Sequence, residues 1–343
     1  MKYIDLRSDS VTMPTEEMRE VMYKADVGYN PYGEDPSVNR LEELAAEMTG
    51  KEAALFTATG TMCNQLAILS FTERGDEIIL SSDSHISNSE AGAVAVLSSV
   101  SYHSIFSDDG ILRSSRIEMA IRPPDKITSA RTGLLCLENA LGRGTALPLH
   151  LMKEAYETAR KYNVPVHTDG ARIFNAVHAL NTGLKDIGKY TDSLAIHLSK
   201  ALCAPIGSIL TGSADFIKKA KKYRHMLGGG WSHPGILAAA GIVALETMVD
   251  RVKEDNANAA YMRGLLSRLP NVEVNFKQAE INLVFFTLSL SGEKVDALPQ
   301  YMFSHGVKIL PAKRGAFRFA LHKDIQKNDI DTVIQILNGF VSA

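Results

Sequence analysis

Short apolar runs alternate with longer segments of helical periodicity along the first 245 residues. The runs are rich in β-branched and aliphatic residues and predict strands at Ala53–Thr57, Glu77–Leu80, Ser99–Ser104, Gly133–Leu137, Val164–Thr168, Ser193–His197 and Ser208–Thr211. The segments between them predict helices at Val38–Thr49, Asn64–Phe71, Leu151–Tyr162 and Asp215–Met226. This alternation is typical of βαβ units and predicts an α/β fold with a mostly parallel central sheet.

The pattern changes in the last third of the chain. One long helix is predicted over Pro234–Glu254, and its small residues favour a close helix contact. Beyond it we expect two strands within 271–290, a helix near 293–305, strands near 308–310 and 317–321, and a helix at 327–341. We therefore predict a large domain of residues 1–245 and a small C-terminal α+β domain of residues 246–343.

Composition narrows the class of protein. The chain has 343 residues, 45% hydrophobic and 22% charged, and a net charge of −2 with no long run of one sign. This balance argues against a binder of nucleic acid or of membrane surfaces, and no apolar run is long enough to span a bilayer. The first residues lack the apolar stretch of a signal peptide, and Cys63, Cys136 and Cys203 lie in apolar surroundings. We expect a cytoplasmic protein with reduced thiols.

Two polar side chains directly follow predicted strands. Lys200 comes after the run that ends at His197 and precedes an uncharged stretch, where desolvation would lower its pKa as a Schiff-base lysine requires. The alternative is a surface lysine in a loop. Asp169 follows a strand and precedes Gly170, so it either pairs with a cation such as a protonated pyridine nitrogen or caps the next helix.

Two further stretches offer ligand chemistry. A predicted strand leads into Thr59, Gly60 and Thr61, where the backbone N–H groups of a helix start could bind a phosphate. The stretch lacks the spacings of ATP- and dinucleotide-binding loops, and the alternative is an ordinary capped turn. His85 follows another strand and could stack on a flat ring, act as a base, or simply be hydrogen-bonded in a loop.

Several strings together resemble one family. They are DLRSDSVT at 5–12, YGEDPSVNRLE at 32–42, HTDGARIFNA at 167–176, LSKALCAPIGS at 198–208 and MLGGG at 226–230. The chain resembles the threonine aldolase family of fold-type I enzymes, which depend on pyridoxal 5′-phosphate (PLP). The resemblance runs from Met1 to about Leu245 and continues more weakly through the C-terminal unit, where RFALH at 318–322 matches a family pattern.

The resemblance implies a role for each matching residue. Lys200 would hold PLP covalently, Asp169 would bind the pyridine nitrogen, Gly60 and Thr61 would bind the phosphate, and His85 would stack on the ring. No metal is implied.

The same resemblance implies which residues bind the substrate and which reaction they serve. The carboxylate of an amino acid substrate would be bound by Ser8, Arg172 and Arg318, and Arg172 would contact the cofactor as well. The implied activity is an aldehyde-lyase that cleaves a β-hydroxy-α-amino acid, such as threonine or allo-threonine, to glycine and an aldehyde. A homotetramer is implied too.

The sequence departs from the family pattern near the expected site. Leu141 stands where the family usually has a histidine expected to touch the substrate hydroxyl, and Ser232 stands where it has an arginine. Aromatic residues common after His85 are replaced by the segment 87–89, and a more acidic stretch is replaced by 29–31. We expect His233, His85 or a water to replace the missing histidine. Two alternatives stay open: β-elimination, racemisation or transamination on the same cofactor, and a non-enzymatic protein of this fold.

Overall fold

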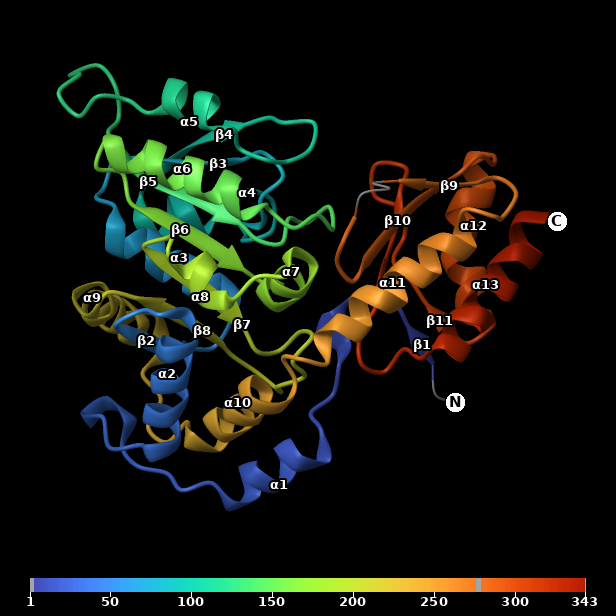
Figure 1. Cartoon of the computed structure of the whole chain (residues 1–343), viewed down its shortest axis with the longest axis horizontal. Coiled ribbons are helices and arrows are strands. Elements are labelled where there is room, and N and C mark those ends of the chain that lie inside the picture. The colour runs from blue at the N-terminus through green and yellow to red at the C-terminus, as the bar shows by residue number, and fades with distance from the viewer. Residues whose placement is uncertain (1–2, 276–278, 343) are drawn as a thin grey trace.

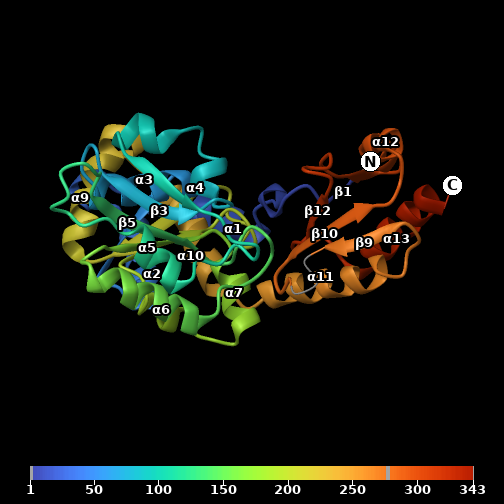
Figure 2. The ribbon, with the colours of Figure 1, turned by 90° about the horizontal axis from the view of Figure 1, so that it is seen from above.

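The computed structural model describes residues 3–275 and 279–342. The chain forms a larger and a smaller lobe that lie side by side (Figures 1 and 2). Both β1 and α13, near the two ends of the chain, lie in the smaller lobe. Within the described residues, no helix has the length and apolar character that crossing a membrane requires.

A sheet of seven strands runs through the larger lobe in the order β2-β8-β7-β6-β5-β3-β4. These strands are β2 (Ala53–Thr57), β3 (Glu77–Ser81), β4 (Ser101–Ile105), β5 (Thr132–Glu138), β6 (Val166–Gly170), β7 (Ser193–His197) and β8 (Ser208–Gly212). β8 is antiparallel to both of its neighbours, and all other pairings in this sheet are parallel. The predicted α/β class with a mostly parallel central sheet is confirmed.

Helices cover both faces of this sheet because successive side chains of each strand point to opposite sides. Leu55 and Leu210 pack with α3 (Gly60–Phe71) and α9 (Ala214–Arg224). Phe56 and Ile209 pack in the opposite layer, which is formed by α2 (Pro36–Thr49), α6 (Leu149–Lys161), α7 (Ile173–Leu180), α8 (Leu184–Gly188) and α10 (Gly235–Thr247). The remaining helices of this lobe are α1 (Glu16–Lys24), α4 (His85–Asn88) and α5 (Ser114–Ala120).

Local signals in the sequence explain where α2 begins and ends. The side chain of Asp35 accepts the backbone N–H of Val38 at 3.1 Å, and Gly50 ends the helix with a left-handed φ of 67°. Asp35 also accepts the N–H of Gly235 at 2.9 Å, which joins the starts of α2 and α10. A Cβ atom on Gly241 would lie 2.9 Å from Leu41, so the small residues of α10 permit the close contact that we predicted.

The smaller lobe combines a second sheet with three helices. Its antiparallel sheet has the order β12-β10-β9, with β9 at Val272–Asn275, β10 at Leu283–Leu288 and β12 at Phe317–Ala320. Its helices are α11 (Val252–Leu266), α12 (Gly292–Ser304) and α13 (Lys327–Ser342). β1 (Ile4–Asp5) pairs in parallel with β11 (Val307–Lys308), and Leu6 packs in the same core cluster as Phe286. The N-terminal strand thus shares a core with the C-terminal unit, while the division at residue 245 stays a prediction.

The prediction of one helix over Pro234–Glu254 is wrong. α10 ends at Thr247 and α11 begins at Val252. At the break, Arg251 donates hydrogen bonds to the carbonyl of Ala201 at 3.0 Å and to the carboxylate of Asp255 at 2.7 Å. The bond to Ala201 joins the start of α11 to the loop after β7, and the turn between α10 and α11 directs the chain from the larger to the smaller lobe (Figure 1).

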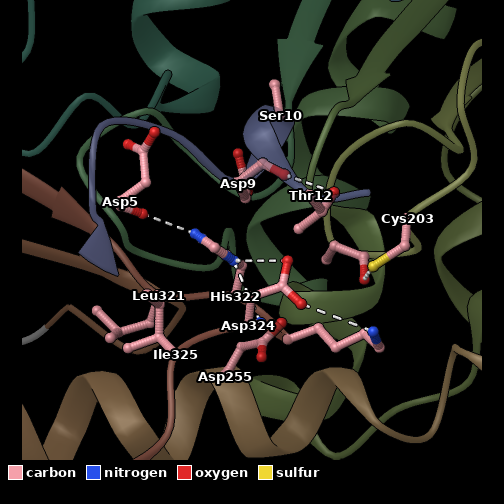
Figure 3. A network of polar contacts seen from close by, with 12 residues as sticks. Asp5, Asp9, Ser10, Thr12, Cys203, Asp255, Leu321, His322, Asp324 and Ile325 are labelled. Carbon is pink, nitrogen blue, oxygen red and sulfur yellow. Dashed lines mark hydrogen bonds and ion pairs between the residues drawn. The ribbon is translucent and has the colours of Figure 1, made fainter. Parts of the chain in front are cut away.

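A polar network attaches the N-terminal segment to the smaller lobe (Figure 3). His322 donates from Nε2 to the carbonyl of Asp5 at 2.8 Å, and its Nδ1 accepts the N–H of Asp324 at 3.4 Å. The N–H of Ala320 donates to the carbonyl of Leu6 at 3.0 Å. These contacts lead the segment toward the larger sheet, where Thr12 donates to the carbonyl of Lys200 at 2.9 Å.

Candidate active site

The carboxyl ends of β3, β5, β6 and β7 meet at one edge of the larger sheet. They carry His85, Glu138, Asp169 and Lys200. A cavity of about 600 Å³ opens at this edge and is lined from the smaller lobe by Arg318 among others. Ligands of open α/β sheets bind in this position, beyond the carboxyl ends of the strands.

Lys200 lies in the loop after β7 and lines the cavity. Its carbonyl accepts hydrogen bonds from the side chain of Thr12 and from the N–H of Cys203, so the backbone is held on both sides. Burial lowers the pKa of the Lys200 ammonium, and the nearby Arg172 lowers it further. A larger share of free amine at neutral pH is what a lysine that bonds covalently to a carbonyl requires.

Asp169 is buried beside the cavity and ionised. Its Oδ2 accepts from Asn64 at 2.8 Å, its Oδ1 accepts from the N–H of Ala171 at 2.9 Å, and Nε2 of His197 lies 3.6 Å from Oδ1. Burial alone would raise the pKa of Asp169, but the charge of Lys200 and the hydrogen bond from Asn64 hold it below its ordinary value. The carboxylate is thus prepared to stabilise a positive charge in the cavity.

One buried amide connects Asp169 with His85. Nδ2 of Asn64 donates to Asp169 and also to Glu90 at 2.7 Å, and Glu90 accepts from Nδ1 of His85 at 2.9 Å. Because both hydrogens of Asn64 are used, its Oδ1 must accept from Nε2 of His167, 3.0 Å away. Burial lowers the pKa of His167 to about 4, so that ring is neutral, whereas the hydrogen bond to Glu90 raises the pKa of His85.

Arg172 is bound by an acidic residue that sequence reasoning missed. Its Nε and Nη2 donate to the two carboxylate oxygens of Asp9 at 2.7 and 2.8 Å, and Asn282 donates to the same carboxylate at 3.0 Å. Asp9 is fully buried. Despite that burial, Arg172 and Lys200 hold the pKa of Asp9 well below its ordinary value. The pair fixes the guanidinium at the cavity wall.

Two further residues were expected to bind the substrate carboxylate. Arg318 belongs to β12, and Ser8 belongs to the N-terminal segment. Arg318 lines the cavity and donates from Nη2 to the carbonyl of Arg7 at 3.1 Å, while its buried Nε has no hydrogen-bond partner among the described residues. Burial, and then Arg172, lowers the pKa of Arg318. Ser8 accepts the N–H of Ser10 at 3.1 Å and caps a short turn, and it is not among the residues that line the cavity.

Gly60 and Thr61 form the first turn of α3, which Thr59 caps by accepting the N–H of Met62 at 3.1 Å. A Cβ atom on Gly60 would lie 1.9 Å from Cε1 of His197, so only glycine allows the two groups to approach. His197 is neutral because burial, and then Lys200, lowers its pKa to about 3. Its buried Nε2 has no hydrogen-bond partner among the described residues.

Glu138 is a second acidic residue that sequence reasoning missed. It ends β5, lines the cavity and accepts the N–H of His85 at 3.0 Å. Burial, and then the charge of Asp169, raises its pKa from 4.5 to about 7. Leu141 is buried and lines a smaller pocket of about 20 Å³ that shares Glu138 with the main cavity. A leucine there cannot exchange protons with a substrate.

The departures at 29–31 and at Ser232 lie outside the cavity lining, whereas Asn88 and Ser89 of the segment 87–89 line the cavity. Ser232 accepts the N–H of Asn30 at its carbonyl, and the His233 ring lies 6.2 Å from that of Tyr29. His85 does line the cavity. Of the two histidines that we named for the role of the missing histidine, His85 is the one that lines the cavity, and its role stays a prediction.

The oxygen and nitrogen atoms of His85, Glu90 and Asp169 lie within 4.8 Å of one another, as the ligands of a metal ion would. All three already hydrogen-bond to other side chains of the chain. The expected absence of a metal stays a prediction.

Comparison with known proteins identifies the family. Residues 5–289 match the beta-eliminating lyase model. The low specificity L-threonine aldolase of Escherichia coli K12 is 43% identical over 340 residues, which cover 99% of each chain. The solved threonine aldolase of Leishmania major superposes with a TM-score of 0.85 at 18% identity, covering 98% of this chain and 99% of that one. Serine palmitoyltransferase of S. paucimobilis with a bound PLP–myriocin adduct superposes with a TM-score of 0.75 at 17% identity, covering 98% and 87%.

The fold and the site define a PLP-dependent lyase of fold-type I. Within that class, the chain belongs to the low-specificity L-threonine aldolase family. The residues present fit the cofactor: an ionised Asp169 for the ring nitrogen, the N–H groups at the start of α3 for a phosphate, and an amine at Lys200. Nε2 of His197 is buried, has no hydrogen-bond partner among the described residues, and lies 3.6 Å from Asp169 and close to Gly60 at the start of α3.

Proposed function

We propose that this enzyme cleaves β-hydroxy-α-amino acids of the threonine type to glycine and an aldehyde. The observation that carries the proposal is the convergence of Lys200, Arg172 and Arg318 on one cavity beside the ionised Asp169. The E. coli relative named for threonine cleavage supports the substrate class.

Each predicted site residue has a part in this reaction. Lys200 would hold the cofactor, Asp169 would bind its ring nitrogen, Gly60 and Thr61 would bind its phosphate, and His85 would cover the ring. PLP, when bound, takes up the electron pair released when the Cα–Cβ bond breaks. The guanidinium groups of Arg172 and Arg318 bind the substrate carboxylate and so orient the bond that breaks. Ser8, which the family resemblance adds to this group, is not among the residues that line the cavity.

The β-hydroxyl must lose its proton before the aldehyde can leave. Glu138 lines the cavity and has a pKa raised to about 7, so it can accept a proton near neutral pH. Glu90 hydrogen-bonds to the His85 ring and raises the pKa of that ring, which favours its charged form. We assign the proton transfer to Glu138, with His85 as the group that positions it through the backbone hydrogen bond.

Product analysis tests the function. Purified enzyme supplied with PLP is incubated with threonine, allo-threonine and bulkier β-hydroxy amino acids, and the aldehyde and glycine formed are measured. Equal amounts of both products support the proposal. Keto acid with ammonia, or the D-isomer of the substrate, would show instead a β-elimination, transamination or racemisation on the same cofactor. Lys200→Ala serves as the control without the covalent lysine.

We further propose a homotetramer in the cytoplasm. Tyr29 and Tyr32 form an exposed aromatic pair with ring centroids 4.8 Å apart, and the ring of His233 lies 6.2 Å from that of Tyr29. An apolar surface of this kind supports a subunit contact. The three cysteines are buried and unpaired, which supports a reducing compartment. Light scattering on the purified enzyme measures the number of subunits, and fractionation of cells shows the compartment that holds the protein.

A further inference from the structure

The outer wall of the cavity includes a tight hairpin between β11 and β12. Lys313 and Ala316 exchange two backbone hydrogen bonds of 2.9 and 3.2 Å. The two residues between them, Arg314 and Gly315, have φ values of 55° and 82°. Two consecutive left-handed residues are typical of the two-residue hairpin turn with a rigid, defined twist. The turn holds the side chains of Lys313 and Arg314 at the mouth of the cavity, which both of them line.

Two other positively charged residues of the cavity wall already form ion pairs, and a third is assigned to the cofactor. Arg172 is paired with Asp9, and Arg143 is paired with Asp83. Lys200 is the lysine for the cofactor. By contrast, within residues 3–275 and 279–342 neither Lys313 nor Arg314 takes part in an ion pair or a side-chain hydrogen bond. The mouth therefore carries two positive charges that the fold itself does not neutralise.

The cavity that these charges line measures about 600 Å³, a volume that would hold the cofactor as well as the substrate. Its wall also includes the apolar residues Phe285, Leu310 and Pro311. An apolar wall that ends at two cations is complementary to a side chain with an apolar body and an anionic end.

We propose that Lys313 and Arg314 form a subsite for an anionic group at the far end of the β-substituent. The preferred substrates are then β-hydroxy-α-amino acids with a second acid group, carboxylate or phosphate, on that substituent. The inference rests on the proposed function, in which the Cα–Cβ bond breaks, the β-hydroxyl loses its proton and Cα gains one. The aldehyde that leaves carries the acid group, and no further reactant is needed.

Binding of two matched amino acids tests the subsite without turnover. Phenylalanine and para-carboxyphenylalanine lack the β-hydroxyl, so neither can be cleaved, and they differ by one carboxylate. Their dissociation constants for the PLP-loaded enzyme are measured by the change in cofactor absorbance. We expect the carboxylate to strengthen binding, and we expect the double variant Lys313→Gln/Arg314→Asn to reduce this preference about threefold to fivefold. Asparagine tolerates the left-handed backbone at position 314.

The control is Lys294→Gln, which removes an exposed lysine of α12 that does not line the cavity. It should leave the preference unchanged, and high salt should weaken the preference in the wild type. The single variant Lys313→Gln gives a smaller effect in the same direction and serves if the double variant is unstable. A preference that is the same in wild type and in both hairpin variants overturns the subsite.

The two proposals fail in distinguishable ways. para-Carboxyphenylserine and phenylserine are then offered as cleavable substrates. If neither yields an aldehyde while the binding preference depends on Lys313 and Arg314, the proposed function fails and the subsite stands. If both are cleaved with the same KM in wild type and double variant, the subsite fails and the function stands.

Discussion

At the scale of single residues, the site depends on buried amides as much as on the charged groups that line the cavity. Asn64 is completely buried and donates to two carboxylates, Asp169 and Glu90, that would otherwise lie side by side without a shared donor. His167 fixes the orientation of Asn64 from behind. The position of the Asp169 charge, which we propose to bind the ring nitrogen, is therefore set by neutral groups outside the cavity.

We expect Asn64→Leu to weaken PLP binding about tenfold to a hundredfold, because a hydrogen bond to a charged group contributes about 1.5–3 kcal/mol. The measurement is the dissociation constant of PLP from equilibrium dialysis, with thermal unfolding of the cofactor-free chain as a check on folding. Gln65→Met is the matched control, since Gln65 is equally buried in α3 and donates to Glu90 alone. Equal loss of PLP binding in both variants would contradict a special role for Asn64.

The raised pKa of Glu138 predicts the pH dependence of turnover. The group must be ionised to accept the β-hydroxyl proton, so kcat/KM should rise with pH through about 7 and level off above it. Glu138→Gln should lose this limb of the profile and most of the activity. A Gln variant that keeps both the activity and the limb would assign the proton transfer to another group, and His85→Asn is then the next variant to measure.

At the scale of elements, the start of α3 serves both the fold and the site. The strand-to-helix turn after β2 presents backbone N–H groups at the carboxyl edge of the sheet, and it can do so only because Gly60 lets the His197 ring lie against it. The sequence pattern predicted this helix and its phosphate-binding turn from local signals. It did not predict the contact with His197, because the two residues meet only through the pairing of β2 with β8 and β8 with β7.

Gly60→Ala should therefore abolish tight PLP binding, since the added methyl group overlaps the His197 ring. The double variant Gly60→Ala/His197→Ala restores the space and should recover part of the binding, measured by dialysis as above. Gly264→Ala in α11 is the matched control, because a Cβ atom there meets nothing within 4 Å. That change should stabilise the chain by up to about 1 kcal/mol. No recovery in the double variant would show that steric overlap is not the cause.

At the scale of the whole molecule, the parts of the site that the sequence predicted are those set by local signals. Lys200, Asp169 and His85 each follow a strand, and the strands were recognisable from their apolar runs. Asp9 and Asn64 were missed because their partners Arg172 and Asp169 lie 163 and 105 positions away. The same limit explains the wrong long helix, which is broken by a contact of Arg251 with Ala201, 50 positions away.

The N-terminal segment packs with the smaller lobe, and the Asp9–Arg172 ion pair connects this segment to the larger lobe. We therefore expect loss of the pair to lower the stability of the whole chain. Asp9→Asn leaves the Arg172 charge buried without its partner and should lower the free energy of unfolding by about 3–5 kcal/mol at neutral pH. Because the pKa of Asp9 is lower in the folded than in the unfolded chain, its contribution is fully present above about 4 and is lost as the pH falls further.

Urea unfolding of wild type and variant measures this difference across that range of pH. The control is Asp5→Asn in the same segment, whose partly exposed pair with Arg7 should contribute at most about 1 kcal/mol. The difference between wild type and Asp9→Asn should remain constant from neutral pH down to about 4 and then narrow. If Asp9→Asn destabilises the chain no more than Asp5→Asn does, the buried pair does not join the lobes energetically. Arg172 must then be held at the cavity wall by its packing alone.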